Sequence, residues 1–342
     1  MFRSIPLIRA SVFGPFLKWA IDRGRPAEAM LRDAGLGHLW LDDPDLLIPF
    51  LAVAEILDRM QREEGPDIGC RVVTETSIFE IGLIGRAALS ARSLREAAGR
   101  VAGTQSYNVS TSFYSFVPRP GGLALQHGLN MPLPPAVLHV AESYTAALLA
   151  SLCRHARLRS PAFEAIEIVP HPDHGVAHLQ PWFDCEVRAA RRPPLCLHVS
   201  DAVLDAPFPK SLAQGIAHAS GAIDGGGPRL AEIGVAESTR FLVRSMLRVG
   251  APTVERMAGF AGMSVRSYQR RLAEEGATYS AIVEEERRRV LHETLGDKTV
   301  LLADVATHLG YARQSSLTRA VRRWTGKPPQ SLRDRERHDV KA

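Results

Sequence analysis

Features that mark several protein classes are missing or scarce in this 342-residue chain. It contains only four cysteines, Cys70, Cys153, Cys185 and Cys196, and no two of them are spaced as a CxxC pair. So few cysteines in a chain of this length do not form a disulfide framework. We therefore expect buried free thiols that pack in the core.

The sequence also lacks a long uninterrupted apolar run. Its longest apolar stretch, PPAVLHVAESYTAALLASLC, contains His139 and Glu142. The opening stretch MFRSIPLIRASVFGPFLKWA lacks an apolar signal core followed by a small-residue cleavage site. A membrane-spanning helix and a secretory signal are therefore not expected. The sequence predicts a cytoplasmic protein that has no membrane partner.

The short motifs of common catalytic and cofactor-binding sites are absent as well. There is no GxSxG elbow, no P-loop and no HExxH. The glycines of EIGLIG are wrongly arranged for a dinucleotide-binding loop. We predict no catalytic residues, no cofactor and no enzymatic activity.

What the chain does have is an uneven distribution of charge. From residue 229 to the end there are 21 Lys and Arg against 14 Asp and Glu, whereas the preceding part has 21 against 23. Eighteen of the 21 basic residues in the last third are Arg, which makes bidentate contacts to phosphate and to guanine. Such a balance suggests a nucleic-acid partner.

The glycine-rich stretch ASGAIDGGGP divides the chain where the charge changes. The length and the 45% hydrophobic content favour more than one domain. We therefore predict a domain at 1–218, a Gly-rich linker at 219–228 and a basic domain at 229–342.

The basic domain contains the pattern of two helix-turn-helix units. After an amphipathic helix at Glu237–Val249, each unit has a short apolar face, a glycine turn and a second helix. In the first unit these are Val254, Met257, Ala258 and Ala261, then Gly262, then Val265–Glu274. In the second they are Leu302, Val305, Ala306 and Leu309, then Gly310 and Tyr311, then Gln314–Thr325. A linking helix with Ile282, Val283, Val290 and Leu291 as apolar positions lies between them.

The second helix of the second unit carries an unusual set of side chains. The stretch RQSSLTRAVRRWTGKPP holds five basic residues and no acidic one. A solvated helix usually mixes both charge signs, so a negatively charged partner is expected to face this one. Two such helices on a stiff linker can enter successive major grooves of DNA, which repeat every 34 Å or so (about one helical turn).

The signature DVATHLGYARQSSLTRAVRRWTGKPPQSLR and the order of these elements resemble the DNA-binding domain of the AraC/XylS family of bacterial transcriptional regulators. The resemblance covers Glu237–Arg335. It departs from the family pattern at Val321, where an aromatic residue is usual, and at Leu301, where Ser or Thr is common. These two departures imply that the second unit packs slightly differently from the usual pattern of the family.

The same resemblance implies roles for individual side chains. The positions that face the bases map to Arg266, Gln269, Arg270, Gln314, Ser315, Thr318 and Arg319. The positions that face the phosphates map to Arg322, Arg323 and Lys327.

The first two-thirds of the chain read as a mixed α+β domain. Helical patterns lie at Ser11–Arg23, Ala27–Ala34, Pro49–Glu63, Ser93–Ala102 and Pro134–Arg157. Strand patterns lie at Ser110–Val117, Leu123–Leu129, Ala165–Val169 and Leu195–Val199, with PRPGG as a hairpin turn between the first two. The stretches IPLIRASVFGPFLKW to LLIPF and EIGLIGRAALSARSLREAAGRV resemble the arabinose-binding-like domain of some AraC-type regulators. This implies sensing or dimerisation without identifying arabinose as the ligand.

Two clusters in this domain are candidate sensing sites. HPDHGVAH brings together His171, His174 and His178, with Asp184, Cys185, Cys196 and His198 nearby in sequence. These residue types suit a transition metal, but the spacing fits no structural zinc module, so we predict no metal site. The aromatic residues of TQSYNVSTSFYSF suit either an apolar effector pocket or ordinary core packing, and we favour the core.

Together these features predict a cytoplasmic transcriptional regulator. Because activation is the commoner outcome in the family that it resembles, we expect an activator. An α+β N-terminal sensor domain is followed by an all-α C-terminal domain with two helix-turn-helix units joined by a linker helix. The expected partners are double-stranded DNA, RNA polymerase, an unidentified small-molecule effector and a second copy of the chain. The alternatives are a DNA-modifying or repair enzyme that uses the same domain for targeting, and a structural nucleic-acid-binding protein.

Overall fold

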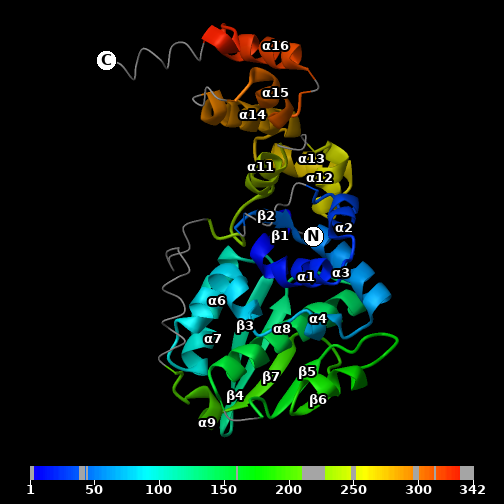
Figure 1. Ribbon diagram of the computed structural model, residues 1–342, viewed down its shortest axis with the longest axis vertical. Coiled ribbons are helices and arrows are strands. Elements are labelled where there is room, and N and C mark those ends of the chain that lie inside the picture. Colours follow the sequence, from blue (N-terminus) through cyan, green and yellow to red (C-terminus); the bar gives the residue numbers. More distant parts are fainter. Residues whose placement is uncertain are drawn as a thin grey trace. The chain divides into compact units, whose positions relative to one another are not determined.

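A computed structural model describes residues 4–37, 43, 45–158, 161–209, 228–247, 252–295, 300–311 and 313–331. The chain divides into two compact units (Figure 1). We call Pro6–Ile233, the part predicted to sense an effector, the sensor unit. We call Gly234–Ala342 together with Met1–Ile5, the part predicted to bind DNA, the DNA unit. Most of the Gly-rich linker predicted at 219–228 lies outside the described residues, so those predicted boundaries stay a prediction.

The sensor unit mixes helices and strands, as the sequence predicts. Its helices are α1 (Ala10–Asp22), α2 (Ala27–Asp33), α3 (Phe50–Glu64), α4 (Ile68–Arg71), α5 (Ser77–Glu80), α6 (Gly82–Leu89), α7 (Leu94–Thr104), η1 (Gln105–Tyr107), α8 (Pro135–His155), η2 (Ala177–Trp182) and α9 (Asp201–Leu204). Its strands are β1 (Leu7–Arg9), β2 (Leu47–Pro49), β3 (Ser112–Arg119), β4 (Gly122–Leu129), β5 (Ala165–Ile168), β6 (Glu186–Ala189) and β7 (Leu195–Ser200).

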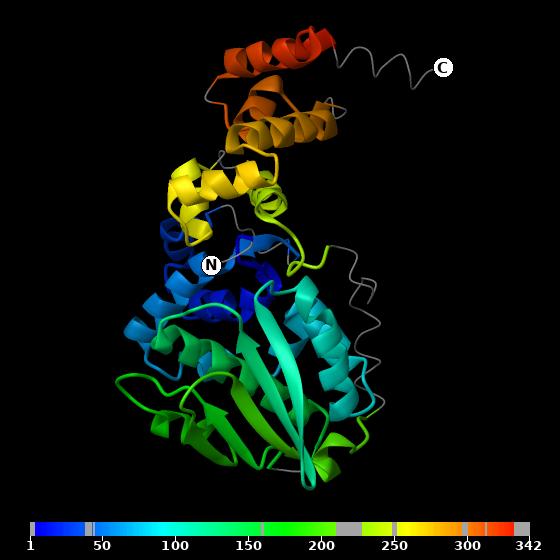
Figure 2. The same ribbon diagram turned by 180° about the vertical axis from the view of Figure 1, so that it is seen from behind.

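The central sheet of the sensor unit has the strand order β3-β4-β7-β5-β6. Only β5 and β6 run parallel, and the other neighbours are antiparallel. The predicted hairpin is confirmed: Arg119 pairs with Gly122, and Gly121 adopts φ 74°, a left-handed conformation that glycine tolerates. In Figure 2 the strands lie in front of the helices, so the helical layer covers the other face.

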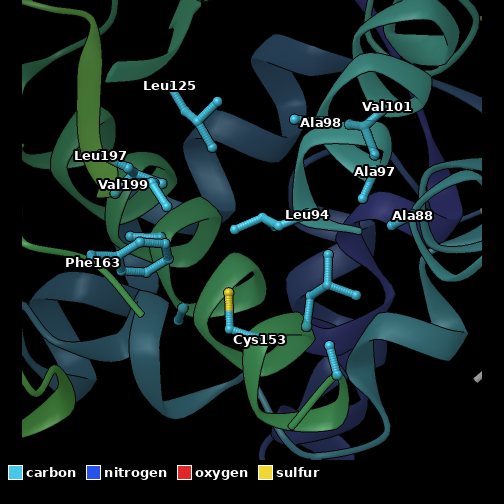
Figure 3. Close-up of a cluster of buried hydrophobic side chains, with 14 of the residues drawn as sticks. Ala88, Leu94, Ala97, Ala98, Val101, Leu125, Cys153, Phe163, Leu197 and Val199 are labelled. Atoms are coloured by element: carbon cyan, nitrogen blue, oxygen red, sulfur yellow. The ribbon is translucent and has the colours of Figure 1, made fainter. Parts of the chain in front are cut away.

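The core of the sensor unit fills the space between sheet and helices. Figure 3 shows Leu94 of α7 extending towards Leu125 and Leu197 of the sheet, and Ala98 and Val101 of the same helix belong to this buried cluster. Small side chains on α7 let this helix approach its neighbours closely. Of the cysteines, Cys70, Cys153 and Cys196 are buried and Cys185 is partly buried, and all four are free thiols.

Helix α8 is long and apolar enough to cross a membrane, with a mean hydropathy of 1.4 in its most apolar window. However, 67% of that window is buried inside the sensor unit. His139 and Glu142, which interrupt the run, are buried and hydrogen-bonded to the chain. Helix α8 is therefore the core helix of a folded domain.

The described part of the DNA unit is helical. Its helices are α11 (Val235–Met246), α12 (Val254–Phe260), α13 (Val265–Glu274), α14 (Tyr279–Leu295), α15 (Leu302–His308) and α16 (Gln314–Thr325). The predicted bounds of α13 and α16 are confirmed. Helix α11 begins two residues before the predicted Glu237, because the backbone amides of Val235 and Ala236 donate to Glu275 at 2.9 and 2.8 Å.

This cap also fixes the residue before α11. A Cβ on Gly234 would lie 2.5 Å from a carboxylate oxygen of Glu275, so a larger residue there would displace the capping carboxylate. A carboxylate at a helix N-terminus is favoured by the helix dipole as well as by the two hydrogen bonds. Glu275 thus joins the end of the first helix-turn-helix unit to the start of the DNA unit.

The linking helix α14 is held by an ion pair that its apolar pattern does not reveal. The Nε of Arg244 on α11 lies 2.7 Å from Oε2 of Glu286, whose side chain is 2% exposed. Ile282, Val283 and Leu291 are buried as predicted, and Val290 is partly buried. The buried carboxylate locks α11 and α14 at a defined register.

Candidate DNA interface and effector cavity

The two helix-turn-helix units share one turn geometry. Gly262 and Gly310 adopt φ 62° and 71°, which few other residues accept. The amide of Met263 donates to Ala258 O at 2.9 Å, and the amide of Tyr311 donates to Ala306 O at the same distance. Ala258 and Gly262 have the same spacing as Ala306 and Gly310, so the two units repeat a structural motif as well as a sequence pattern.

Helix α13 is oriented by one fully buried tyrosine. The hydroxyls of Tyr268 and Thr239 on α11 lie 2.7 Å apart, and Leu272 is buried one turn further on. Because Tyr268 and Leu272 point inwards, the opposite side of the helix faces solvent. Arg266, Gln269 and Arg270, the residues predicted to face the bases in this unit, are all exposed there.

Helix α16 is oriented in the same way by Leu317, Ala320 and Val321, which are buried in the core of the second unit. Val321 therefore fills the place of the usual aromatic residue. The other side of α16 carries the predicted base-facing residues. Gln314, Ser315 and Arg319 are exposed, and Thr318 is partly buried and donates to Gln314 O at 3.1 Å.

The buried anchors show which positions of the two helices correspond. Tyr268 matches Leu317, so Arg266, Gln269 and Arg270 match Ser315, Thr318 and Arg319 in order. Both sets project from the same side of their helix relative to the turn. Gln314 is the first residue of α16. The N-terminal residues of recognition helices commonly contact base edges in the major groove.

The exposed arginines of α13 and α16 differ in whether a carboxylate of the same chain lies close to the guanidinium. In the part of the chain that the structure describes, Arg266 and Arg322 form no ion pair. Arg270 lies 3.6 Å from Glu274, and Arg323 lies 3.1 Å from Glu284 of α14. An arginine without an internal carboxylate gains more from a phosphate than one already paired. Lys327 is exposed beyond the left-handed C-cap of Gly326.

Helix α15 begins without a side-chain cap. Its N-cap residue is Leu301, which is 67% exposed and cannot accept a hydrogen bond from the first turn. The corresponding residue before α12 is Thr253, whose hydroxyl accepts from the amide of Arg256 at 3.3 Å. The departure of Leu301 from the family pattern thus costs the second unit a capping interaction.

We expect Leu301→Thr to raise the free energy of unfolding of the DNA unit by about 1 kcal/mol. The new hydroxyl gains a backbone partner, and an exposed apolar side chain is removed. Urea denaturation midpoints measure the change. Leu301→Ala is the control, since it removes the apolar surface without adding an acceptor; a gain as large with Ala as with Thr would contradict the capping explanation.

The sensor unit contains an apolar cavity of about 110 Å³. It lies between β1, α1, α3, α6, α8 and the β3–β4 hairpin. Most of its lining is aliphatic or phenylalanine, and no Asp, Glu, Lys or Arg contributes to it. Its polar side chains are Gln105, Ser112, Tyr114, His127, Tyr144 and Thr145.

The polar side chains of the cavity fall into two groups. The hydroxyls of Tyr144 and Thr145 donate to Val12 O at 2.9 Å and Ala141 O at 3.0 Å, so the backbone already occupies them. In contrast, Oε1 of Gln105 and Nδ1 of His127 are buried and have no hydrogen-bond partner. The Nε2 of Gln105 donates to the hydroxyl of Ser112, which holds the amide in place. Unpartnered buried polar atoms are uncommon and costly.

The aromatic stretch around β3 therefore has mixed roles. Tyr114 lines the cavity, with its ring centroid 4.8 Å from that of His127. Phe113 packs over Gly128 on β4, and Phe116 is 39% exposed on the edge strand. Tyr107 contacts Arg229 outside the cavity. The prediction of ordinary core packing is thus incomplete for Tyr114, and the cavity residue Gln105 carried no sequence signal.

Residues 24–208 match the family described as the arabinose-binding domain of AraC transcription regulators, and residues 257–335 match a helix-turn-helix domain family. The first match alone covers more than half of the chain. The chain belongs to the AraC family of transcriptional regulators. It is a DNA-binding regulator with an N-terminal effector-binding domain, and its helix-turn-helix units are the DNA-binding part.

Relatives of this regulator carry similar names. An uncharacterized HTH-type transcriptional regulator of Mycobacterium tuberculosis is 27% identical over 337 residues, which cover 91% of each chain. The transcriptional regulator VirS of the same species is 38% identical over 92 residues, 27% of each chain. The ornithine utilization regulator of Pseudomonas aeruginosa is 34% identical over 108 residues, 31% of this chain and 32% of that one.

The histidine-rich loop of the regulator folds against α8. His171, His174 and His178 lie together, with ring centroids 4.9–6.4 Å apart, and α8 adds His139, whose Nε2 lies 2.9 Å from Nε2 of His178. Within the described residues, no group of three or more His, Cys, Asp or Glu could hold a metal ion. His139 is instead held by its Nδ1–H, which donates to Val169 O at 2.7 Å.

The buried histidines and Glu142 have opposite effects on the stability of the sensor unit as the pH falls. Burial lowers the pKa of His139 to about 4, and burial likewise lowers the pKa of His127 in the cavity to about 4. Burial also raises the pKa of Glu142 to about 7, although its Oε2 accepts from the amide of Val169. The histidines are therefore neutral and Glu142 is partly protonated near neutral pH.

We expect the free energy of unfolding of the sensor unit to fall by about 1–2 kcal/mol between pH 7 and pH 5. In the unfolded chain both histidines bind protons below pH 6.5, so their contribution to stability is lost as the pH falls towards 4. Glu142 acts oppositely, because its raised pKa favours the folded state below pH 7, but one glutamate does not offset two histidines. Urea denaturation across this range measures the slope, and His139→Gln should flatten it; an equal slope in this variant would contradict the assignment.

A second cluster bears on the alternative that the N-terminal part is an enzyme. The Sγ of Cys196 lies 3.7 Å from Nε2 of His198, and the same nitrogen lies 3.0 Å from Oε1 of Glu167. A nucleophilic relay needs the carboxylate on the other ring nitrogen. Burial also raises the pKa of the Cys196 thiol, which keeps it protonated. This arrangement supplies no activated nucleophile, and the other thiols are likewise raised in pKa by burial.

Proposed function

We propose that this regulator reads a specific DNA site with α13 and α16 and that a small molecule bound in the sensor unit controls the outcome. Arg266, Gln269 and Arg270 of α13 contact base edges in one major groove. Gln314, Ser315, Thr318 and Arg319 of α16 contact those in the next. The supporting observation is that both sets lie on the exposed side opposite a buried anchor, in two units with one turn geometry.

Arg322, Arg323 and Lys327 bind the phosphates that flank the second reading helix. All three are exposed at the C-terminal part of α16 or just beyond it. Arg323 exchanges its contact with Glu284 for a phosphate when DNA binds, which an exposed ion pair permits at little cost. Glu284 keeps the indole of Trp324 as a donor at 2.6 Å.

The regulator acts in the cytoplasm as a homodimer, and it activates transcription through contact with RNA polymerase. The effector shifts a population between two arrangements of the paired DNA units. It performs no catalysis itself, in keeping with the family and with the inert geometry at Cys196. The effector site is the apolar cavity, because its wall includes two residues, Gln105 and His127, that carry buried polar atoms without partners.

The test is a selection of genomic fragments by the purified full-length chain at about 150 mM salt, where nonspecific phosphate contacts are weakened. We expect enrichment of a site with two half-elements separated by about one helical turn. Salt-sensitive binding without sequence preference would refute the proposed reading helices. Genes next to the enriched sites would then identify metabolites for testing as effectors.

A further inference from the structure

The cavity selects its ligand by the groups that it leaves unpaired. Any bound molecule must match an apolar wall, and two residues of that wall, Gln105 and His127, each carry a buried polar atom without a partner, Oε1 and Nδ1. Gln105 Oε1 can only accept a hydrogen bond, so the ligand must supply an O–H or N–H group. A cavity of about 110 Å³ holds a single ring or a short chain.

Charge excludes other ligands. No ionised side chain lines the cavity, and the low pKa of His127 leaves its imidazole neutral at physiological pH. A carboxylate or an ammonium group would lose its hydration there without gaining a counter-ion. A saturated hydrocarbon would leave the two polar atoms of the cavity unsatisfied.

The residues after Gln105 hold both segments that lead into the DNA unit. The amide of Leu230, which is fully buried, donates to Ser106 O at 2.7 Å. The guanidinium of Arg229 lies 5.8 Å from the ring centre of Tyr107, and its Nε donates to the Tyr107 hydroxyl at 3.3 Å. Four residues further on, Gly234 begins the DNA unit.

The N-terminal segment is anchored at the same place. The Nε of Arg9 donates to Tyr107 O and its amide donates to Asn108 O, both at 2.8 Å. Strand β1, which contains Arg9, also contributes Ile8 to the cavity wall. Just before it, Ile5 belongs to the DNA unit, where its amide donates to the Ser238 hydroxyl at 3.2 Å. Both chain crossings between the units therefore start from residues 105–108.

Building on the proposed effector site, we infer that the cavity binds an uncharged small molecule with an apolar body and an O–H or N–H group, and that η1 transmits its binding to the two crossing segments. A ligand hydrogen-bonded to Gln105 restrains the first residue of η1. Ser106 and Tyr107 then hold Leu230 and Arg229 more firmly. The DNA unit receives this restraint through both connections.

Four ring-sized probes test the ligand class on the full-length chain by calorimetry. Benzyl alcohol, toluene, benzoate and benzylamine share a ring and differ in charge and hydrogen-bonding group. We expect benzyl alcohol to bind about tenfold more tightly than toluene and the two ions not to bind. Gln105→Met should reduce this preference for the alcohol, and Ala141→Leu, which fills the cavity from α8, should abolish binding of every probe.

Stronger binding of benzoate or benzylamine, or binding that survives Ala141→Leu, would overturn the inference about the ligand. So would the absence of binding by all four probes. Specific DNA enrichment by the wild-type chain is measured independently, so a failed ligand class is distinguishable from a failed regulator. DNA binding by each variant also reports that it is folded.

Transmission is tested by hydrogen exchange of the Leu230 amide. Saturating benzyl alcohol should slow exchange in the peptide that contains residues 228–233, because the bond to Ser106 O opens less often. The peptide covering α9 is the internal control. Unchanged or faster exchange at 228–233 while the probe binds would overturn the role of η1.

Discussion

Arg319→Ala is expected to weaken binding to the selected DNA site by about 1–3 kcal/mol and to relax sequence preference at one base pair. Arg319 is exposed on the side of α16 that carries the predicted base-facing residues, and among the described residues its guanidinium donates only to the Ser316 hydroxyl, at 3.5 Å. The guanidinium is therefore available for a bidentate contact. Binding titrations against the selected site and its single-base variants measure both effects.

Arg322→Ala is the matched control on the same helix. We expect it to weaken every sequence alike and to reduce the slope of log affinity against log salt by about one. Arg322 is exposed one turn from Arg319 and forms no ion pair within the described chain, so its loss disturbs no internal contact. If Arg319→Ala also affected all sequences equally, its assignment to base reading would be wrong.

Arg244→Met is expected to lower the free energy of unfolding of the DNA unit by about 3 kcal/mol. The Glu286 side chain is 2% exposed, and its Oε2 lies 2.7 Å from Nε of Arg244. Removing the cation leaves a buried carboxylate uncompensated. Arg244 is 33% exposed, so water screens part of the pair and the loss falls at the lower end of the usual range.

The double variant Arg244→Met/Glu286→Met separates charge from packing. It should recover most of the stability, because two apolar side chains of similar length can pack where the ion pair stood. Denaturation midpoints of the two single variants and the double variant form the cycle. A double variant as unstable as Arg244→Met would show that packing of the arginine stem, and not the stranded charge, sets the cost.

Much of the DNA unit could be predicted because local rules decide it. The turns at Gly262 and Gly310 need left-handed backbone, and the caps at Thr253 and Ser264 are short-range signals. The start of α13 after Ser264 followed from such a signal. The start of α11 did not, because the cap at its N-terminus comes from Glu275, far along the chain.

The sensor unit was predicted less completely for a similar reason. The long helices and the β3–β4 hairpin carry clear periodicity, whereas β1, β2 and α4 to α6 are short and have little pattern of their own. Their formation depends on pairing and packing with distant segments. For example, β1 pairs with β2 about forty residues away, a contact with no local signature.

The sequence by itself determined the class of this protein: two helix-turn-helix units with arginines on their reading helices, behind an α+β domain of the AraC type. Those properties reside in spacing, charge and turn residues, which are local. Only the tertiary structure decided where a ligand can sit and how the units are connected to it. Nothing in the sequence distinguishes Gln105, His127 and Leu230. The fold places Gln105 and His127 in the wall of one cavity, each with a buried unpaired polar atom. It also bonds Leu230, which leads into the DNA unit, to Ser106, the residue after Gln105.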